Sequence, residues 1–263
     1  MSIYDDKSLL ICCSVLAALL GAVFGSFLNC AAFRIARGEP FTKGRSRCPN
    51  CGHDLGVLDL IPIASWIFLG GKCRYCKTKI PVRYLLAEVT FAAVTVVCLL
   101  RFDLTVLCVR NWIFLCCLFC LALVDLEKFE IPDGCLIIAA VAWALALPFT
   151  GDWKQTLLKG LIAAVVFGGG MLLISLAMDR ALKKESLGGG DIKLFAVVGL
   201  YLGIVGTLFS VILACILGLL LGLARKTEKG GQIPFGPAIA LSAALTLLFG
   251  SGLIERYLSL IGY

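Results

Sequence analysis

The stretch of residues 9–33 contains no charged side chain and is the strongest constraint on what this chain can fold into. An α-helix needs about 20 apolar residues to cross the hydrocarbon core of a bilayer, which is about 30 Å thick. Over the whole chain 60% of the residues are apolar and 16% are charged, and the mean hydropathy is +0.98. These values exclude an ordinary soluble domain. No basic region precedes the run, so we expect a first transmembrane helix within residues 1–33 and no cleaved signal peptide.

Six further stretches are long, apolar and almost free of charge. They are residues 84–100, 104–124, 131–149, 156–178, 194–224 and 233–249. At about 1.5 Å per residue, the stretch 194–224 is too long for one upright span. Gly199, Gly203 and Gly206 predict a break near its first third, because glycine tolerates non-helical backbone angles. We therefore predict an all-α integral membrane protein with about eight transmembrane helices.

The basic residues predict the orientation, because short cytoplasmic loops collect Lys and Arg. With eight spans and an outside N-terminus, most of the 24 basic residues lie on one face. A seven-span arrangement would place the basic residues of the loop 225–229 outside, so eight spans are favoured. The large extramembrane part is then residues 34–83, on the cytoplasmic side.

Two Cys-x-x-Cys motifs lie within this cytoplasmic segment. Their cysteines are Cys48, Cys51, Cys73 and Cys76. Such a pair of motifs can hold a tetrahedral Zn²⁺, whereas the other ten cysteines lie in apolar runs where thiols pack. So short a segment cannot bury enough apolar surface to fold well alone, and a structural Zn²⁺ would stabilise it. A redox dithiol pair is less favoured, since no strand-to-helix setting surrounds the motifs, and a metal-free segment is a further alternative. His53 could replace one ligand, but a solvated loop histidine is favoured.

Two aspartates stand at the cytoplasmic ends of predicted spans. Asp125 follows the stretch 104–124, and Asp191 follows three glycines and precedes the stretch 194–224. Ionisable groups at this depth usually face the bundle interior or a water-filled cavity. Two carboxylates that share one water can hydrolyse a peptide bond, because one accepts a proton from the water while the other donates one to the carbonyl oxygen.

Helix ends predict the role of each carboxylate. Asp125, at a helix C-terminus, is expected to start protonated as the acid, and Asp191, at a helix N-terminus, to start ionised as the base. Such a pair titrates as a unit. In the structural alternative, Asp191 is an N-cap and Asp125 belongs to a solvated cluster with Glu127, Lys128 and Glu130. Glu88, near the start of its span, is either functional or extends to water.

Motifs along almost the whole chain resemble those of the bacterial type IV prepilin leader peptidases, the Gly-x-Gly-Asp membrane aspartic peptidases. The motifs are Gly25-Ser26-Phe27-Leu28-Asn29, Arg37-Gly38-Glu39, the segments 45–51 and 71–76, Asp125 with Ile131-Pro132-Asp133, the segment 188–194 and Pro234-Phe235-Gly236-Pro237. The resemblance extends to the bifunctional members of the family, which are both peptidases and N-methyltransferases.

The resemblance implies that Asp125 and Asp191 are catalytic, and that the four motif cysteines hold Zn²⁺. Gly188, Gly190 and Lys193 would belong to the active-site loop. Members of the family cleave prepilins and pseudopilins after a glycine at the cytoplasmic membrane face. The bifunctional type then methylates the new N-terminal residue with S-adenosylmethionine. Because the chain retains residues 34–83, methylation is expected, with candidate residues Asn29, Glu39 and Glu88.

We therefore predict three parts: a first transmembrane helix (1–33), a Cys₄ zinc subdomain associated with methyl transfer (34–83) and a transmembrane aspartic peptidase domain (84–263). The expected location is the bacterial cytoplasmic (inner) membrane. The expected partners are a prepilin or pseudopilin and the lipid bilayer, and no nucleic acid. Glu127, Glu130 and Asp133 would form an acidic patch for a basic leader. The alternative function is a non-enzymatic scaffold or a cation or proton transporter, with the aspartates in the ion path.

Overall fold

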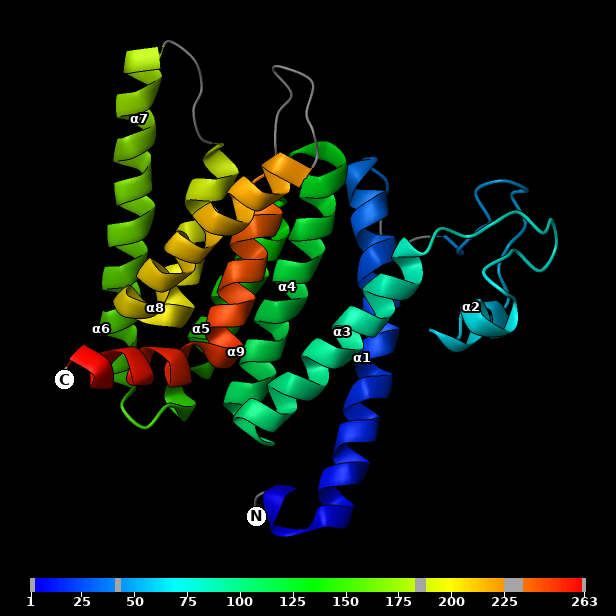
Figure 1. The fold of residues 1–263 in the computed structure, drawn as a ribbon, viewed down its shortest axis with the longest axis horizontal. Helices are drawn as coiled ribbons and strands as arrows, with labels where there is room; N and C mark the ends of the chain where they lie inside the picture. The colour runs from blue at the N-terminus through cyan, green and yellow to red at the C-terminus, as the bar shows by residue number, and fades with distance from the viewer. Residues whose placement is uncertain (1–2, 41–43, 183–187, 225–233, 262–263) are drawn as a thin grey trace. The chain divides into compact units, whose positions relative to one another are not determined.

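The computed structural model describes residues 3–40, 44–182, 188–224 and 234–261 (Figure 1). These residues are mainly helical, and their extended pairing is limited to two isolated bridges, Arg47 with Asp54 and Lys72 with Lys79. The chain divides into two units, Met1–Cys108 and Val109–Tyr263. The predicted all-α class is confirmed.

Five helical stretches are long and apolar enough to cross a membrane. They are Lys7–Ala36, Arg83–Phe102, Val106–Lys128, Trp153–Ala181 and Gly189–Leu223. Two shorter apolar helices, Asp133–Phe149 and Gly236–Gly250, accompany them. The chain is thus a multi-pass α-helical membrane protein, and the count of eight spans stays a prediction.

The first unit is built on two long helices. Its elements are η1 (Ile3–Asp5), α1 (Lys7–Ala36), η2 (Val57–Asp59), α2 (Ala64–Phe68) and α3 (Arg83–Phe102). Helices α1 and α3 pack closely, because a Cβ at Gly21 would lie 2.7 Å from the Ala92 Cα and one at Gly25 would lie 2.9 Å from the Ala87 carbonyl oxygen. Helix α1 ends at a turn in which the Glu39 N–H donates to the Arg34 carbonyl and Gly38 has a φ of 70°, a common way for a helix to stop.

The second unit is a bundle formed by the remaining helices. They are α4 (Val106–Lys128, whose first residues precede the division), α5 (Asp133–Ala146), η3 (Leu147–Phe149), α6 (Trp153–Ala164), η4 (Val165–Gly169), α7 (Gly170–Leu182), α8 (Gly189–Ala224) and α9 (Gly236–Ile261). Helix α8 contacts α5, α6 and α9 and contributes the fully buried Leu194 and Val198 to the core. Helix α8 therefore lies at the centre of this unit.

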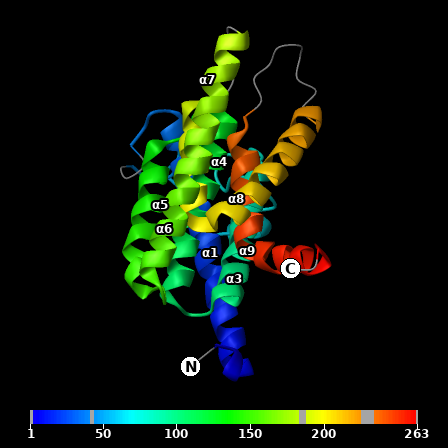
Figure 2. The ribbon, with the colours of Figure 1, turned by 90° about the vertical axis from the view of Figure 1, so that its left-hand side faces the viewer.

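Helix α8 is bent at Gly203, whose φ of 65° and ψ of −172° lie outside the helical region. Both arms rise from this bend in Figures 1 and 2, so the apolar stretch 194–224 does not form one straight helix. Of the three glycines that predicted a break, Gly203 makes it. Gly199 instead allows close packing on α6, because a Cβ there would lie 2.8 Å from the Ala163 carbonyl carbon.

Candidate active site and metal centre

Asp125 lies in the last turn of α4 and is only 5% exposed. Its Oδ2 accepts a hydrogen bond of 2.9 Å from the backbone N–H of Gly236, the first residue of α9. A Cβ at Gly236 would lie 2.7 Å from the same oxygen. Only glycine therefore lets this backbone come so close to the carboxylate.

Asp191 lies in the first turn of α8, which begins at Gly189. The Asp191 N–H donates to the Gly188 carbonyl at 3.0 Å, so Asp191 is already part of the helix and does not cap it. Gly190 packs against Ile131, which a Cβ at position 190 would approach to 2.9 Å. The close contact of α8 with the α4–α5 loop therefore depends on a residue without a side chain.

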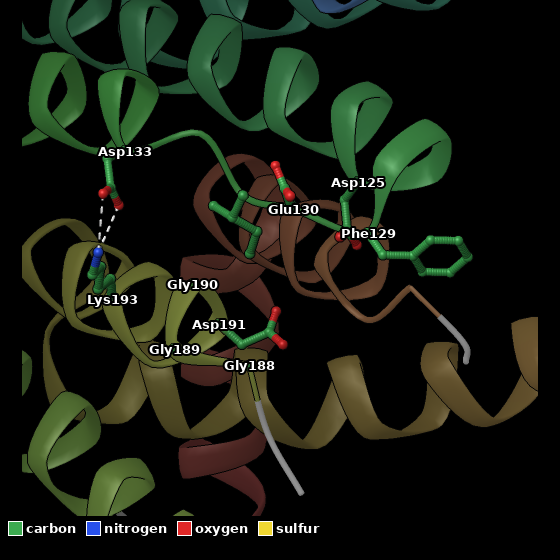
Figure 3. A pocket seen from close by; sticks show the side chains of 10 residues that line it. Asp125, Phe129, Glu130, Asp133, Gly188, Gly189, Gly190, Asp191 and Lys193 are labelled. Atoms are coloured by element: carbon green, nitrogen blue, oxygen red, sulfur yellow. Dashed lines mark hydrogen bonds and ion pairs between the residues drawn. The ribbon is translucent and has the colours of Figure 1, made fainter. Parts of the chain in front are cut away.

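The two aspartates line one cavity of about 360 Å³. Its other lining residues are Phe129, Glu130, Ile131, Asp133, Gly188, Gly189, Gly190 and Lys193. Figure 3 shows the carboxylates of Asp125 and Asp191 extending into the same space, while the ring of Phe129 points away from both. A cavity of this size falls within the range of ligand sites. The arrangement can hold a water and a peptide bond between two carboxyl groups.

Lys193 and Asp133 close one side of the cavity. The Lys193 Nζ lies 2.8 Å from Asp133 Oδ1 and 3.1 Å from Oδ2, which joins the N-terminal part of α8 to the start of α5 (Figure 3). Glu130 is paired with Lys128 at 2.7 Å. Two of the three carboxylates of the predicted acidic patch thus already have lysine partners from this chain.

The contact between Gly236 and Asp125 was not predicted. The Pro-Phe-Gly-Pro motif predicts only that a helix starts near Gly236, because proline is favoured in the first turn of a helix. The N-terminus of α9 carries partial positive charge, and the C-terminus of α4 carries partial negative charge. The two helix ends act on Asp125 in opposite directions. Helix dipoles alone therefore do not assign the acid and the base.

The four motif cysteines come together in the first unit. Their sulfur atoms all lie within 4.8 Å of one another, and the Sγ atoms of Cys48 and Cys76 are 3.8 Å apart. Zn–S bonds of about 2.3 Å in a tetrahedron imply a sulfur–sulfur distance of about 3.8 Å. The donor set and its spacing therefore fit a metal ion such as zinc.

Two tight turns present these cysteines. The Gly52 N–H donates to the Cys48 carbonyl at 2.9 Å, and the Lys77 N–H donates to the Cys73 carbonyl at 3.0 Å. Gly52 and Lys77 have φ values of 70° and 59°, so both turns use the left-handed backbone region. The two motifs thus form matching knuckles.

Side chains around the knuckles support the cluster. Asn50 belongs to the first knuckle, and its side-chain amide donates a hydrogen bond of 2.8 Å to the hydroxyl of Thr78, which follows the second knuckle. Hydrogen bonds with Thr78 also lower the pKa of Cys76 to about 6. The ring of His53 contacts that of Tyr75, with ring centroids 3.6 Å apart and the planes tilted by 38°. The sulfur cluster is complete without this histidine.

Asp59 ties η2 to the second knuckle, a role that sequence reasoning missed. It accepts hydrogen bonds from the Arg74 Nε at 2.6 Å, the Gly56 N–H at 3.1 Å and the Tyr75 hydroxyl at 3.4 Å. The bond from the Arg74 guanidinium holds the pKa of the Asp59 carboxyl below its usual range. The spacing of Asp59 and Arg74 in the sequence does not predict that they pair.

The three methyltransferase candidates differ in their burial and in their hydrogen bonds. Glu88 is 9% exposed and accepts a hydrogen bond of 2.7 Å from the Ile63 N–H, whereas Asn29 is half-buried on α1 and Glu39 is exposed just after it. Among the residues with described positions, no hydrogen bond joins these three side chains. The Glu88 carboxylate is therefore buried against the Ile63 N–H and does not extend to water.

Comparisons with known proteins agree with these features. Residues 19–102 match a family model described as the bacterial peptidase A24 N-terminal domain, and residues 112–223 match one described as the type IV leader peptidase family. A prepilin leader peptidase/N-methyltransferase of Bacillus subtilis is 32% identical, and the alignment covers 92% of this chain and 96% of that protein. Proteins of the same name from Pseudomonas putida and Pseudomonas aeruginosa are each 28% identical over more than nine tenths of both chains. No solved structure matches.

Proposed function

Because the chain belongs to the type IV leader peptidase family, we propose that it removes the leader from a type IV prepilin or pseudopilin and N-methylates the new N-terminal residue. The observation that carries the peptidase proposal is the single cavity lined by Asp125 and Asp191. The two residues come from helices far apart in the sequence, yet their carboxylates face the same space (Figure 3).

In the proposed reaction, a water between the two carboxyl groups attacks the carbonyl carbon of the scissile peptide bond. The ionised carboxylate accepts a proton from the water, and the protonated carboxyl group donates its proton to the carbonyl oxygen. When the C–N bond of the tetrahedral intermediate breaks, the carboxyl group that took the proton from the water donates it to the leaving amine, and the other carboxylate takes back a proton from a hydroxyl of the intermediate. The Gly236 N–H holds the Asp125 carboxylate in position.

The expected site of cleavage is the cytoplasmic face of the inner membrane. The distribution of Lys and Arg predicts this face as the cytoplasmic one, and the same orientation would put the helix ends that carry both aspartates there. A prepilin whose hydrophobic segment lies in the bilayer would present its leader junction at the same level. The ion pair between Lys193 and Asp133 supports the loop that would receive it.

For methyl transfer, we propose that Cys48, Cys51, Cys73 and Cys76 hold a structural Zn²⁺ that joins the two knuckles. S-adenosylmethionine would supply the methyl group. Asn29 and Glu39 remain candidates for contact with the donor or the amine. Glu88 is proposed to act by holding Ile63, because its carboxylate is buried against that N–H.

Mass spectrometry of a prepilin incubated with the purified protein tests this function. We expect cleavage after one glycine and, with S-adenosylmethionine present, one added methyl group on the new N-terminal residue. Omission of the donor should leave cleavage intact. Absence of cleavage together with ion-dependent flux through reconstituted vesicles would favour the transporter alternative.

Gly236→Ala is expected to lower kcat/KM for leader cleavage by about 10²-fold, because displacement of a catalytic group by about 1 Å can have this effect. The added Cβ would lie 2.7 Å from Asp125 Oδ2 and would push the carboxylate out of place. Gly252→Ala is the matched control on the same helix, since nothing lies within 4 Å of a Cβ at that position. Equal activity of the two variants would contradict the positioning role of Gly236.

A further inference from the structure

An exposed group of apolar side chains lies between the two zinc knuckles in the sequence. It consists of Val57, Leu58, Ile61, Ile67 and Phe68, hereafter the apolar patch, which are 84%, 68%, 43%, 60% and 87% exposed. They belong to or flank η2 and α2, two short helices that contact each other. Large apolar side chains exposed to this degree on two neighbouring short helices are typical of an interaction site.

The start of α2 is held against α3, a helix long and apolar enough to cross a membrane. The Ile63 N–H, at the start of α2, donates to Glu88, which lies five residues inside α3. At about 1.5 Å per residue, this is about 7 Å from the beginning of the helix. Figure 1 accordingly shows α2 beside the first turns of α3, not beyond its end.

The patch is also rigidly supported. Asp59 of η2 is bonded to Arg74 and Tyr75 of the second knuckle. Trp66 of α2 packs on Gly71, where a Cβ would lie 2.7 Å from the Trp66 ring. The apolar side chains therefore project from a fixed surface and cannot easily turn inward.

Three lysines flank the cysteines of the second knuckle, to which the patch is tied through Asp59. Lys72, Lys77 and Lys79 are exposed, and none of them forms an ion pair within the described part of the chain. The acidic neighbours Asp54 and Asp59 are already paired with Arg47 and Arg74. The second knuckle therefore has uncompensated lysines next to it in the sequence, and such lysines attract anionic lipid headgroups.

We propose that the apolar patch docks into the adjacent leaflet of the bilayer, with Lys72, Lys77 and Lys79 at the anionic headgroups. Segments with apolar residues on one side and basic residues beside them lie about 5–10 Å into the headgroup–acyl boundary. The segment is tethered at both ends by α1 and α3, so its local concentration at the membrane is high. The depth set by Glu88 favours lipid over a soluble partner. Docking would fix the knuckles at the membrane surface.

Fluorescence quenching on the full chain in anionic vesicles tests the proposal. A fluorescent amino acid is placed at Phe68, at Leu19 as a membrane control on α1, and at Arg47 as a water-exposed control. Lipids brominated near the headgroup end of the acyl chain should quench position 68 to about half or more of the level at Leu19, as for an interfacial residue. Aqueous iodide should quench Arg47 strongly and position 68 weakly.

Two outcomes would overturn the proposal. Strong iodide quenching without bromolipid quenching at position 68 would mean that the patch faces water. Protection from both quenchers would mean that protein covers it, either another part of this chain or a second copy. Lys72→Gln/Lys77→Gln/Lys79→Gln should reduce bromolipid quenching at position 68 and leave Leu19 unchanged. An unchanged signal at position 68 would overturn the role of the lysines. Leader cleavage plays no part in these quenching measurements, so they test membrane docking independently of the proposed function.

Discussion

Asp191→Asn is expected to abolish leader cleavage, with a fall in kcat/KM of at least about 10³-fold, because an amide cannot exchange a proton with water or substrate. Asp125→Asn should have the same effect. Both variants keep the size of the side chain, so the protein should remain in the membrane with its fold intact. The measurement is the rate of leader release from a purified prepilin, with circular dichroism as the check on folding.

Asp133→Asn is the matched control, because this carboxylate lines the same cavity but is paired with Lys193. Both partners are more than half exposed, and such an ion pair contributes about 0–1 kcal/mol. The variant should therefore lose no more than about fivefold in rate. Asp125→Asn/Asp191→Asn should be no slower than either single variant, since the two groups act as a unit. Near-normal cleavage by Asp191→Asn would refute the proposed mechanism.

Cys73→Ala is expected to remove the bound metal and to unfold the knuckle segment. Cys73 is only 4% exposed and is one of the four residues of the sulfur cluster. Binding of a structural Zn²⁺ stabilises small zinc-finger folds by about 10–16 kcal/mol, so loss of one ligand should remove most of the stability of this segment. Metal analysis should show loss of zinc, and limited proteolysis should cut between residues 44 and 83. Methylation should be lost more completely than leader cleavage.

Cys12→Ala is the control for this experiment, because Cys12 is an exposed cysteine of α1 outside the cluster. It should retain metal, protease resistance and both activities. Full metal content in Cys73→Ala would contradict the four-cysteine site. Equal loss of methylation and cleavage with an intact knuckle segment would mean that the metal centre also serves hydrolysis.

The sequence by itself determined the class of fold and the local parts of the candidate sites. The uncharged stretch 9–33 became α1, because a long apolar segment in lipid must satisfy its own backbone hydrogen bonds. The four cysteines could be grouped from their spacing, since two residues between ligands form a tight turn with both sulfurs on one side. The positions of Asp125 and Asp191 at helix ends followed in the same way from the limits of apolar runs. Their catalytic role remains a prediction.

Only the tertiary structure decided which distant groups meet. Gly236 lies 111 residues from Asp125 along the chain, and its N–H reaches the carboxylate because α9 begins beside the end of α4. The sequence does not distinguish a functional Glu88 from one that extends to water, and the structure buries it against Ile63. Asp59 likewise accepts a hydrogen bond from Arg74, which lies 15 residues further along the chain. Patterns of hydrophobicity and short spacing describe what one segment prefers, whereas these contacts depend on how several segments pack, and no local pattern encodes that.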